Sequence, residues 1–300
     1  MKEQKHITIT VIILHGHPKG MLIKSLESVF KSTHKSLKIA VIDNGSKDES
    51  LGLIQKNFSS VQILSSSKNL GIASGRNLGL SRLLDTETDY FFLMDSDIIL
   101  HEECLEELLK VMTSDSRIGI TAPVIFKEDG RFLSLGGRYI KFMSQPFLLG
   151  YGKKNSKKRI NFFKKETDYV TGAISLIRKD VFKKAGIFDS RFDPYGFEDI
   201  DWSIRVKKAG YNILIAGKAF ATHKGEFSFF NQTPEKLYET TKKRFFLARK
   251  HLPNLLFFLV FLPFFFLRGV LLTTIIYLFK GKLNLIRATA KGMAHGLGKF

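Results

Sequence analysis

Residues 90–97 read Tyr-Phe-Phe-Leu-Met-Asp-Ser-Asp, five consecutive apolar side chains followed by two carboxylates one residue apart. An apolar run without polar alternation is typical of a strand covered on both faces, as in a parallel sheet flanked by helices. The acids Asp95 and Asp97 end that run, where an unpaired charge is costly unless a cation or a hydrogen-bond donor compensates for it. The stretch therefore predicts a buried central strand and a polar site at its carboxyl end.

The sequence on either side of this strand alternates between strand-like and helix-like segments. Short apolar runs are followed by segments whose apolar residues recur at helical spacing, and Ser46 is expected to cap the second helix. This rhythm predicts an α/β fold, a mixed, mainly parallel sheet flanked by helices. The expected strands are 7–14, 37–42, 61–64, 90–94, 118–126 and 219–222, and the expected helices are 20–31, 46–58, 69–84, 102–112 and 200–209.

Carboxylates follow two of these strands at their carboxyl ends. Asp43 follows the strand 37–42, and Asp95 and Asp97 follow the strand 90–94. Ligands of parallel sheets bind outside the carboxyl ends of the strands. Two carboxylates at one strand end can hold a hard cation, and Mg²⁺ or Mn²⁺ held there can bridge the phosphates of a nucleotide. The same spacing also occurs in ordinary surface turns, so the spacing alone does not indicate a metal site. The buried strand that precedes the pair supports this interpretation.

A second acidic cluster, Glu198, Asp199 and Asp201, opens the expected helix 200–209. Acids in a first helical turn stabilise the helix through its dipole, which is one interpretation. Three acids this close together also raise the pKa of at least one of them, which makes a general base available. Trp202 follows the cluster and either stacks on an acceptor sugar or packs in the core, and Asp201 is a further candidate for contact with the acceptor.

His223 and a glycine-rich loop complete the candidate residues. A neutral imidazole at His223 would extend a metal site formed by the acid pair, although a single histidine is more often structural. The loop at 69–79 leads into a helix, and its amides and Arg76 can face phosphate or a base. It lacks the Gly-Lys-Ser/Thr of a P-loop. The donor-binding candidates of this loop are Asn69, Gly71, Arg76 and Asn77.

The charge of the chain is concentrated in two segments. The net charge is +19, and 18 of these charges lie at 153–165 and 240–300, where no acidic residue occurs. Such an excess predicts an anionic partner: nucleic acid, a membrane surface or a phosphorylated ligand. The remaining chain is nearly neutral. Its single cysteine, Cys104, excludes an internal disulfide framework and a cysteine-rich zinc site, and it favours a reducing compartment.

The segment 255–279 is apolar and rich in phenylalanine. As one helix it would be about 37 Å long, enough to cross a bilayer. Arg268 near its middle and the helix-breaking Pro263 argue against a simple crossing, and both flanks are basic. We therefore expect an in-plane or re-entrant contact with an anionic membrane surface; a hairpin of buried core helices is the alternative. The expected division is a catalytic domain at 1–235 and a membrane-associating region at 236–300.

Five motifs occur in order along the chain and together resemble the family 2 glycosyltransferases with a GT-A fold, especially the rhamnosyltransferase-like and galactofuranosyltransferase-like branches. The resemblance covers roughly residues 6–250. The motifs are Ile42-Asp43-Asn44-Gly45-Ser46, Asn69-Leu70-Gly71 with Arg76-Asn77, Asp95-Ser96-Asp97, Thr171-Gly172-Ala173 and Glu198-Asp199-Ile200-Asp201, followed by the region of His223.

The resemblance implies a nucleoside-diphosphate sugar as donor, Mn²⁺ or Mg²⁺ as cofactor, and transfer to an acceptor hydroxyl with inversion. It implies that Asp43 holds the nucleobase and that Asp95 meets the ribose or the metal. Asp97 would bind the metal that bridges the diphosphate, with His223 as its further ligand.

The resemblance also implies residues for the sugar and for proton transfer. Asp199, beside Glu198, would deprotonate the acceptor, and Gly172 and Ala173 would line the donor-sugar pocket. The loop after the first strand departs from the family, because His15-Gly16-His17-Pro18 stands where a Thr/Ser-aromatic-Asn sequence is usual. No contact of that loop is therefore carried over.

These observations predict a membrane-associated, metal-dependent glycosyltransferase at the cytoplasmic face of the cell membrane, acting on a glycan or lipid-linked acceptor in cell-surface polysaccharide synthesis. One alternative is a nucleotidyltransferase acting on sugar phosphates, which normally needs a glycine-rich loop with a lysine after the first strand. Another is a non-enzymatic protein that binds a membrane or nucleic acid through its basic segments. Nucleic acid is not the expected partner, because it leaves the acidic motifs without a role. The donor sugar, the nucleobase and the oligomeric state stay open.

Overall fold

The computed structural model describes residues 7–16, 21–155, 160–225, 233–279 and 281–298. His17 and Pro18, and the basic residues at 157–159, lie outside the described residues. The chain divides into two compact units. The first comprises Met1–Arg138, Leu148–Pro194 and Glu198–Gly225, and the second comprises Tyr139–Phe147, Tyr195–Phe197 and Glu226–Phe300.

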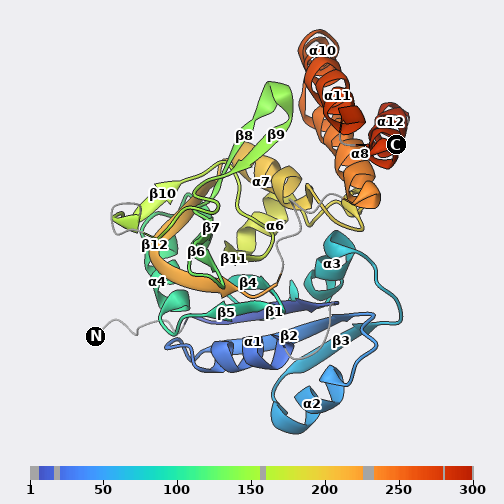
Figure 1. Ribbon diagram of the computed structural model, residues 1–300. Coiled ribbons are helices and arrows are strands. Elements are labelled where there is room, and N and C mark those ends of the chain that lie inside the picture. Colours follow the sequence, from blue (N-terminus) through green and yellow to red (C-terminus); the bar gives the residue numbers. More distant parts are fainter. Residues whose placement is uncertain (1–6, 17–20, 156–159, 226–232, 280, 299–300) are drawn as a thin grey trace. The chain divides into compact units, whose positions relative to one another are not determined.

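The first unit is built around a mixed sheet with ten strands among the described residues (Figure 1). The central order is β10-β12-β6-β11-β4-β1-β2-β3, with β5 paired to β12 and β7 paired to β6. Strands β1 to β4 are parallel, and β11 runs antiparallel between β4 and β6. The strands are β1 (Ile9–His15), β2 (Leu37–Asn44), β3 (Gln62–Ser66), β4 (Tyr90–Asp95), β5 (Ile98–Leu100), β6 (Ile118–Lys127), β7 (Phe132–Ser134), β10 (Lys164–Glu166), β11 (Ile174–Arg178) and β12 (Asn212–His223).

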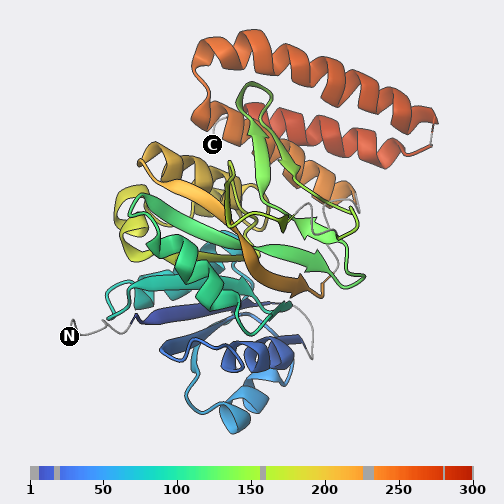
Figure 2. The ribbon, with the colours of Figure 1, turned by 90° about the vertical axis from the view of Figure 1, so that its left-hand side faces the viewer.

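Helices cover both faces of this sheet, as the alternating sequence predicts (Figures 1 and 2). Helices α1 and α4 lie on one face, and α3 lies on the other together with α6 and α7. Two glycines of α3 allow its close approach to the sheet: a Cβ at Gly75 would lie 2.7 Å from the Leu14 side chain, and one at Gly79 would lie 2.8 Å from the Ile42 side chain. The helices are α1 (Met21–Phe30), α2 (Ser50–Asn57), α3 (Ile72–Leu83), α4 (Cys104–Thr113), α6 (Lys179–Ala185) and α7 (Glu198–Lys208), with a short 3₁₀ turn η2 (Ser190–Phe192).

One expected helix start is wrong. Ser46 does not cap α2, which begins at Ser50 after Glu49. The backbone N–H of Ser46 instead donates to Oδ1 of Asp43, 2.8 Å away. The Asp43 side chain thereby closes a turn directly after β2, a local use of aspartate that competes with helix formation.

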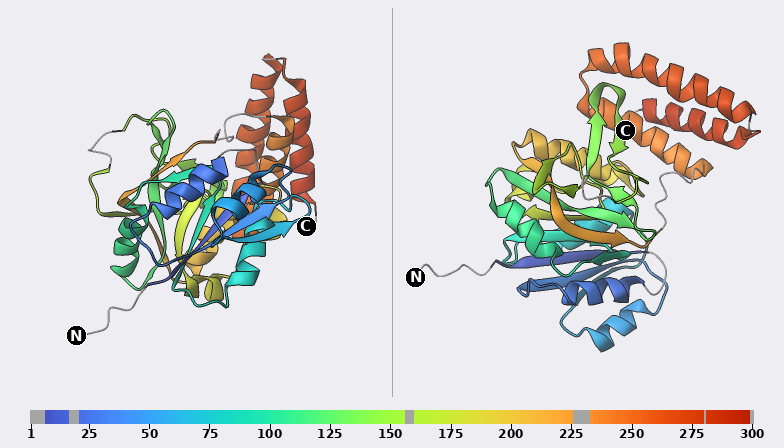
Figure 3. Two further views of the ribbon diagram at one scale, coloured as in Figure 1. Left: turned by 90° about the horizontal axis from the view of Figure 1, so that it is seen from below. Right: turned by 60° about the vertical axis from the view of Figure 1, so that its left-hand side comes forward.

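The second unit contains most of a short hairpin, Tyr139–Phe147, and a group of helices. The hairpin strands β8 (Gly137–Ile140) and β9 (Gln145–Leu148) are joined by the 3₁₀ turn η1 (Lys141–Met143). Helix α8 (Pro234–His251) is followed by a continuous helix from Asn254 to Phe279 and then by α12 (Leu283–Leu297). These three lie side by side (Figures 2 and 3). The continuous helix consists of α9 (Asn254–Leu256), η3 (Phe257–Phe261), α10 (Leu262–Phe264), η4 (Phe265–Leu272) and α11 (Thr273–Phe279).

Pro263 does not break this helix, contrary to the expectation. It lies in α10 between two π-helical stretches, η3 and η4. A wider helical turn is one way in which a helix accommodates a residue that has no N–H to donate. The helix is also not a core helix, because only 17% of its most apolar window is buried. The alternative of a buried hairpin of core helices is therefore wrong for the single chain described here.

Candidate active site

The sheet register brings separate motifs to one edge. In the antiparallel pair β11–β4, Ile174 lies opposite Met94, so Gly172 and Ala173 come beside Asp95. The N–H of Asp95 donates to the carbonyl of Ala173 over 2.9 Å. In the antiparallel pair β12–β5, His223 lies opposite Ile98, the residue after Asp97. The pairing of strands thus assembles motifs that are about 80–130 residues apart in the chain.

The pleat at the end of β4 separates Asp95 from its neighbour Ser96. Successive side chains of a strand point to opposite faces, so Asp95 and Ser96 turn in opposite directions. Asp95 faces Arg76 of α3, and Ser96 lies on the other side, where its Oγ is 3.2 Å from Nδ1 of His15. The two residues therefore belong to two different parts of the site.

Arg76 is the cation around which the carboxylates gather. Its side chain is buried, and its Nη2 donates to Oδ1 of Asp95 over 2.8 Å while its Nη1 lies 3.6 Å from Oε1 of Glu198. Burial lowers the pKa of Arg76, but the attraction of Asp95 and Glu198 outweighs it and raises that pKa. A Cβ at Gly172 would lie 2.6 Å from Nη1. The missing side chain at Gly172 therefore makes room for the guanidinium.

Asp95 keeps a raised pKa despite this partner. Burial is the largest cause, the nearby Asp97 charge adds to it, and Arg76 acts against both. The acid pair therefore presents excess negative charge at this edge of the sheet.

Asp199 lies at the N-terminus of α7 with both carboxylate oxygens engaged. Oδ2 accepts from the N–H of Gly172 over 3.0 Å, and Oδ1 accepts from the N–H of Ile200 over 2.8 Å. Burial, helped by the charge of Glu198, raises the pKa of Asp199 to about 7 and outweighs these hydrogen bonds. A carboxylate with such a pKa exchanges protons near neutral pH, as a general base must.

Asp97 and His223 form the part of the site that fits a divalent cation. Oδ1 of Asp97 is buried, accepts no hydrogen bond from the described residues and lies 3.8 Å from Nε2 of His223. Nδ1 of His223 is 3.1 Å from the carbonyl of Gly225, which fixes it as the protonated nitrogen. In the neutral ring Nε2 then carries no proton, so Nε2 and the orphaned carboxylate oxygen of Asp97 are the two atoms that would ligate a cation.

These two side chains do not make a complete metal site. Within the described part of the chain, no group of three His, Cys, Asp or Glu residues lies close enough to hold a metal ion. A cation at Asp97 and His223 therefore needs oxygen ligands from elsewhere, which the phosphates of a bound nucleotide supply.

The end of β2 holds the glycine-rich loop in place. The Asn44 amide donates to the carbonyl of Gly71 over 2.9 Å and accepts from the N–H of Leu70 over 2.9 Å. Asn69 accepts from the N–H of Gly71 over 2.8 Å. Gly71 has φ +92°, and a Cβ there would strike the Asp193 carboxylate. Asn69 and Gly71 thus shape the loop, and Asp43 lies buried at its base.

Asp193 fixes the N-terminus of α3 against the chain that leads to the second acidic cluster. Its carboxylate accepts from the N–H groups of Ala73, over 2.9 Å, and Ser74, and from the hydroxyl of Ser74. The N–H of Ile72 also donates to the carbonyl of Pro194. This contact sets the spacing between Arg76, one turn into α3, and Glu198.

His15 is a site residue whose partners the sequence does not reveal. It is the last residue of β1, lies in register with Asp43, and is buried. Its Nδ1 is 3.2 Å from the Ser96 hydroxyl and its Nε2 is 3.7 Å from Oδ1 of Asp48. His15 therefore joins the loop of the acidic pair to the turn after β2. The only sequence signal was its place in a loop that departs from the family pattern.

Three expected site residues have partners within the protein. The amide of Asn77 exchanges two hydrogen bonds with the backbone of Phe188. Asp201 is fully buried and accepts from Nε of Arg205 over 2.9 Å. Trp202 packs between Phe182 and Phe188 with 3% of its surface exposed, so it belongs to the core and offers no face to a sugar.

The three residues before Glu198 are held by α8. Tyr195–Phe197 belong to the second unit, as α8 does. The fully buried Lys243 of α8 donates from Nζ to the carbonyl of Tyr195, and the same Nζ lies 3.2 Å from Oε2 of Glu239. Lys243 is thus a positioning residue for the segment that leads into the second acidic cluster.

Residues 10–186 match the family described as glycosyl transferase family 2, more than half of the chain. The chain is 22% identical over 265 residues to an N-acetylglucosaminyl-diphospho-decaprenol L-rhamnosyltransferase of Mycobacterium tuberculosis, covering 81% of this chain and 85% of that protein. It is 23% identical over 233 residues to the O-antigen chain rhamnosyltransferase RfbN of Salmonella typhimurium, covering 77% of this chain and 69% of that protein.

Among solved structures, the chain is similar to GalNAc-T7 with UDP, GalNAc and Mn²⁺. The TM-score is 0.64 at 18% identity, over 82% of this chain. The chain spans about half of that protein, 48% of its length. At this identity the likeness shows the fold, and it confirms the expected GT-A architecture.

Proposed function

The chain belongs to glycosyl transferase family 2, and from this premise we propose that it moves a sugar from a nucleoside-diphosphate sugar to a hydroxyl of a glycan or lipid-linked acceptor. The observation that carries the proposal is the pKa of Asp199, which is raised to about 7. The neighbouring carboxylates of Asp95 and Glu198 are paired with Arg76. Such a carboxylate is suited to take the proton of an acceptor hydroxyl, which is too weakly acidic to attack by itself.

The donor diphosphate would lie at the edge formed by the acidic pair. Asp97 and His223 would hold Mn²⁺ or Mg²⁺, and the bound cation would neutralise the charge that develops on the departing diphosphate. Asp95, which Arg76 fixes through one oxygen, would orient the ribose or share the metal. Asp43 and the turn it closes would receive the base.

Asp199 alone would accept the proton of the acceptor hydroxyl. Its backbone partners Gly172 and Ile200 hold the carboxylate in one orientation, and Glu198 keeps its pKa high. A single base that activates the acceptor on the face opposite the leaving group gives one displacement with inversion at the anomeric carbon. In this account Ala173 borders the donor-sugar pocket, while Gly172 gives Arg76 its space.

The relatives and the C-terminal helix support the proposed acceptor class and location. One relative is named for a decaprenol-linked acceptor and another for an O-antigen chain. The exposed apolar helix Asn254–Phe279 is suited to a membrane. We place the protein at the cytoplasmic face of the cell membrane, where nucleotide sugars and lipid-linked acceptors meet, in the synthesis of cell-surface polysaccharide.

The direct test is release of nucleoside diphosphate from a panel of nucleotide sugars, with lipid-linked and glycan acceptors and with Mn²⁺ or Mg²⁺. One nucleotide sugar is expected to be consumed only when the cation and an acceptor are present. Asp97→Ala is expected to abolish the metal-dependent reaction, while Asp180→Ala, an exposed acid on α6, leaves it unchanged. Turnover by Asp97→Ala at the wild-type rate would refute the site assignment, and pyrophosphate release from a nucleoside triphosphate would favour a nucleotidyltransferase.

A further inference from the structure

The continuous helix Asn254–Phe279 exposes apolar side chains along its whole length. One narrow stripe, Phe257, Phe261 and Phe265, packs on α8 against Phe245, Ala248 and Leu252. Part of the remaining surface is half-buried, some of it against α12, and the other part is exposed, with Leu267 61% and Leu271 51% exposed. An apolar surface of this extent is stable only against another apolar phase.

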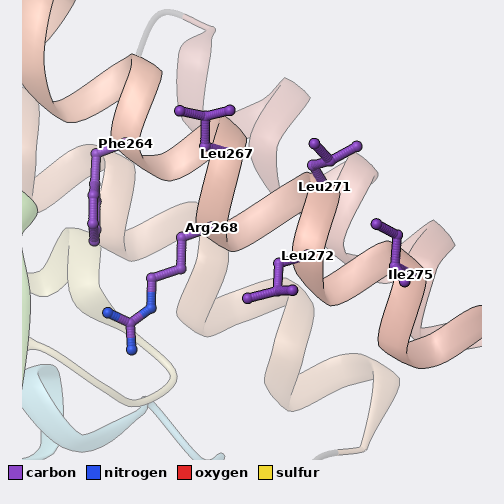
Figure 4. Close-up of a pocket in the computed structure, with 6 residues that line it drawn as sticks. All are labelled: Phe264, Leu267, Arg268, Leu271, Leu272 and Ile275. Carbon is purple, nitrogen blue, oxygen red and sulfur yellow. The ribbon is translucent and has the colours of Figure 1, made fainter.

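A groove on this surface contains one charged group. Its polar member is Arg268, whose guanidinium extends away from the helix axis (Figure 4). The guanidinium lies 5.9 Å from the centre of the Phe264 ring, and among the described residues no carboxylate pairs with it. The side chains that line the groove are Phe264, Leu267, Arg268, Leu271, Leu272 and Ile275.

The neighbourhood of Arg268 is positive. The guanidinium of Arg244 is close enough for its charge to interact with Arg268, and burial together with this repulsion lowers the pKa of Arg244 to about 10. Arg244 is occupied with the carbonyls of Met143 and Ser144. No acidic residue follows Glu239 in the chain. No acid of the described ranges therefore neutralises Arg268, and an arginine fork within an apolar groove matches the phosphate of an amphiphile.

The packing of the helix opposes a crossing of the bilayer. Arg268 lies within two residues of the midpoint of Asn254–Phe279, so a crossing would bring its charge to the centre of the hydrocarbon. The polar helix α8, with Arg249 and Lys250 near its end, lies along the same helix and would have to enter the bilayer with it. Neither objection applies to a helix that lies in the plane of one leaflet.

We propose that Asn254–Phe279 lies in the plane of one leaflet of a phospholipid membrane, with Arg268 bound to a lipid phosphate and a lipid chain along Leu267, Leu271 and Ile275. The occupant is a leaflet and not a single bound lipid, because the exposed apolar surface continues beyond the groove from Leu255 to Phe279. The exposed basic residues Arg249, Lys282 and Arg287 border this helix and favour anionic headgroups. The inference deepens the membrane association proposed above but rests on the second unit alone.

Vesicle flotation of the full chain tests the leaflet contact. The protein is mixed with vesicles of phosphatidylcholine, of phosphatidylcholine with phosphatidylglycerol, or of a neutral phosphate-free glycolipid. Wild type is expected to float with all three and most strongly with the anionic vesicles. Leu271→Glu is expected to lower the bound fraction by about tenfold, since a carboxylate enters the apolar phase. Leu53→Glu, at an equally exposed leucine of α2, is the matched control and is expected to float like wild type.

Arg268→Leu is expected to change vesicle affinity in opposite directions for a helix that lies in the plane of the leaflet and for a helix that crosses the bilayer. If Arg268 binds lipid phosphate, the variant loses about tenfold in affinity for phospholipid vesicles and none for the glycolipid vesicles. If the helix crosses the bilayer, removal of the central charge strengthens binding to all vesicles, and the proposal is overturned. Equal binding of wild type and variant to phospholipid and glycolipid vesicles overturns the phosphate contact. A fourth set of vesicles, phosphatidylcholine with a prenyl diphosphate, separates the two occupants: binding to this set alone would identify the acceptor lipid, not the leaflet, as the occupant.

A labelling experiment tests the topology independently. Asn254→Cys and Lys282→Cys each add one exposed thiol at an end of the helix, while the native Cys104 is buried. On sealed vesicles with protein added outside, an impermeant maleimide is expected to label both positions. Protection of either position shows a crossing and refutes the in-plane arrangement. These readouts need no turnover, so a failed glycosyltransferase assay with intact flotation leaves the docking inference standing, and the reverse also holds.

Discussion

Nη2 of Arg76 lies 2.8 Å from Oδ1 of Asp95, so the acidic pair that ends β4 is bound to the helix that follows the glycine-rich loop. The same guanidinium reaches Glu198 at 3.6 Å and lies next to Gly172. One buried cation thus links the edge proposed for the donor diphosphate to the cluster proposed for the acceptor. In the proposed mechanism, the relative position of metal, sugar and base would depend on this side chain.

Arg76→Met is expected to destabilise the protein by about 3 kcal/mol, because it leaves the half-buried Asp95 and the buried Glu198 without their cation. Urea unfolding of the variant measures the loss. Arg82→Met, at an exposed arginine in the last turn of the same helix, is the control and is expected to change stability by less than about 0.5 kcal/mol. Equal effects of the two substitutions would show that Arg76 does not compensate these acids.

The rate of transfer is expected to fall as the pH drops below about 7, because Asp199 must be ionised to accept a proton. Glu198→Gln is expected to move this acidic limb to lower pH. Removal of the neighbouring negative charge lowers the pKa of Asp199, and Arg76 then interacts with Asp199 more strongly. A pH profile of kcat/KM measures the shift. An unchanged or upward-shifted limb would remove Asp199 from the role of base.

Asp199→Asn is expected to stabilise the fold at neutral pH while it removes activity. The folded protein raises the pKa of Asp199 from 3.8 to about 7, so ionisation is less favourable in the folded than in the unfolded chain. The contribution of this group to stability therefore falls as the pH rises between these two values. The variant has no carboxylate to ionise at this position and so does not lose this stability. Its free energy of unfolding above pH 7, measured by thermal unfolding, is expected to be about 1 kcal/mol or more higher than that of wild type. A difference that is the same at pH 4 and pH 8 would contradict the raised pKa.

His223→Ala is expected to raise the Mn²⁺ concentration needed for thermal stabilisation by a nucleoside diphosphate, by about tenfold. His101→Ala, at an exposed histidine that packs on Phe220, serves as control. The measurement is a Mn²⁺ titration of the unfolding temperature at a fixed nucleotide concentration, which requires no turnover. If both variants require the same Mn²⁺ concentration as wild type, His223 is not a ligand.

Lys243→Met is expected to lower kcat by about tenfold or more and to leave the KM for the donor unchanged, since Tyr195–Phe197 lead directly into Glu198. Lys242→Met removes a charge of the same kind from the neighbouring position, which holds no carbonyl of this segment, and is expected to behave like wild type. A merely structural role of Lys243 would lower stability without this division between kcat and KM.

The sequence predicted the parallel strands and the place of Asp43 and Asp95 at their ends, because apolar runs and strand-end carboxylates are local features. The partners of Arg76 were beyond such reasoning, since Asp95 and Glu198 approach it only through the fold. The role of Trp202 was ambiguous because a residue in the first turn of a helix can face either a ligand or the core. Its packing on Phe182 and Phe188 shows that it belongs to the core. The helix through Pro263 was missed because π-helical turns leave no clear signal in the spacing of apolar residues.

The most direct test of the account compares wild type with Asp199→Asn in one assay that follows nucleoside diphosphate release and sugar transfer to a lipid-linked or glycan acceptor with Mn²⁺. The account predicts that both proteins bind the donor equally, that wild type releases one nucleoside diphosphate per sugar transferred, and that Asp199→Asn transfers at least about a hundredfold more slowly. Transfer by Asp199→Asn at the wild-type rate would contradict it.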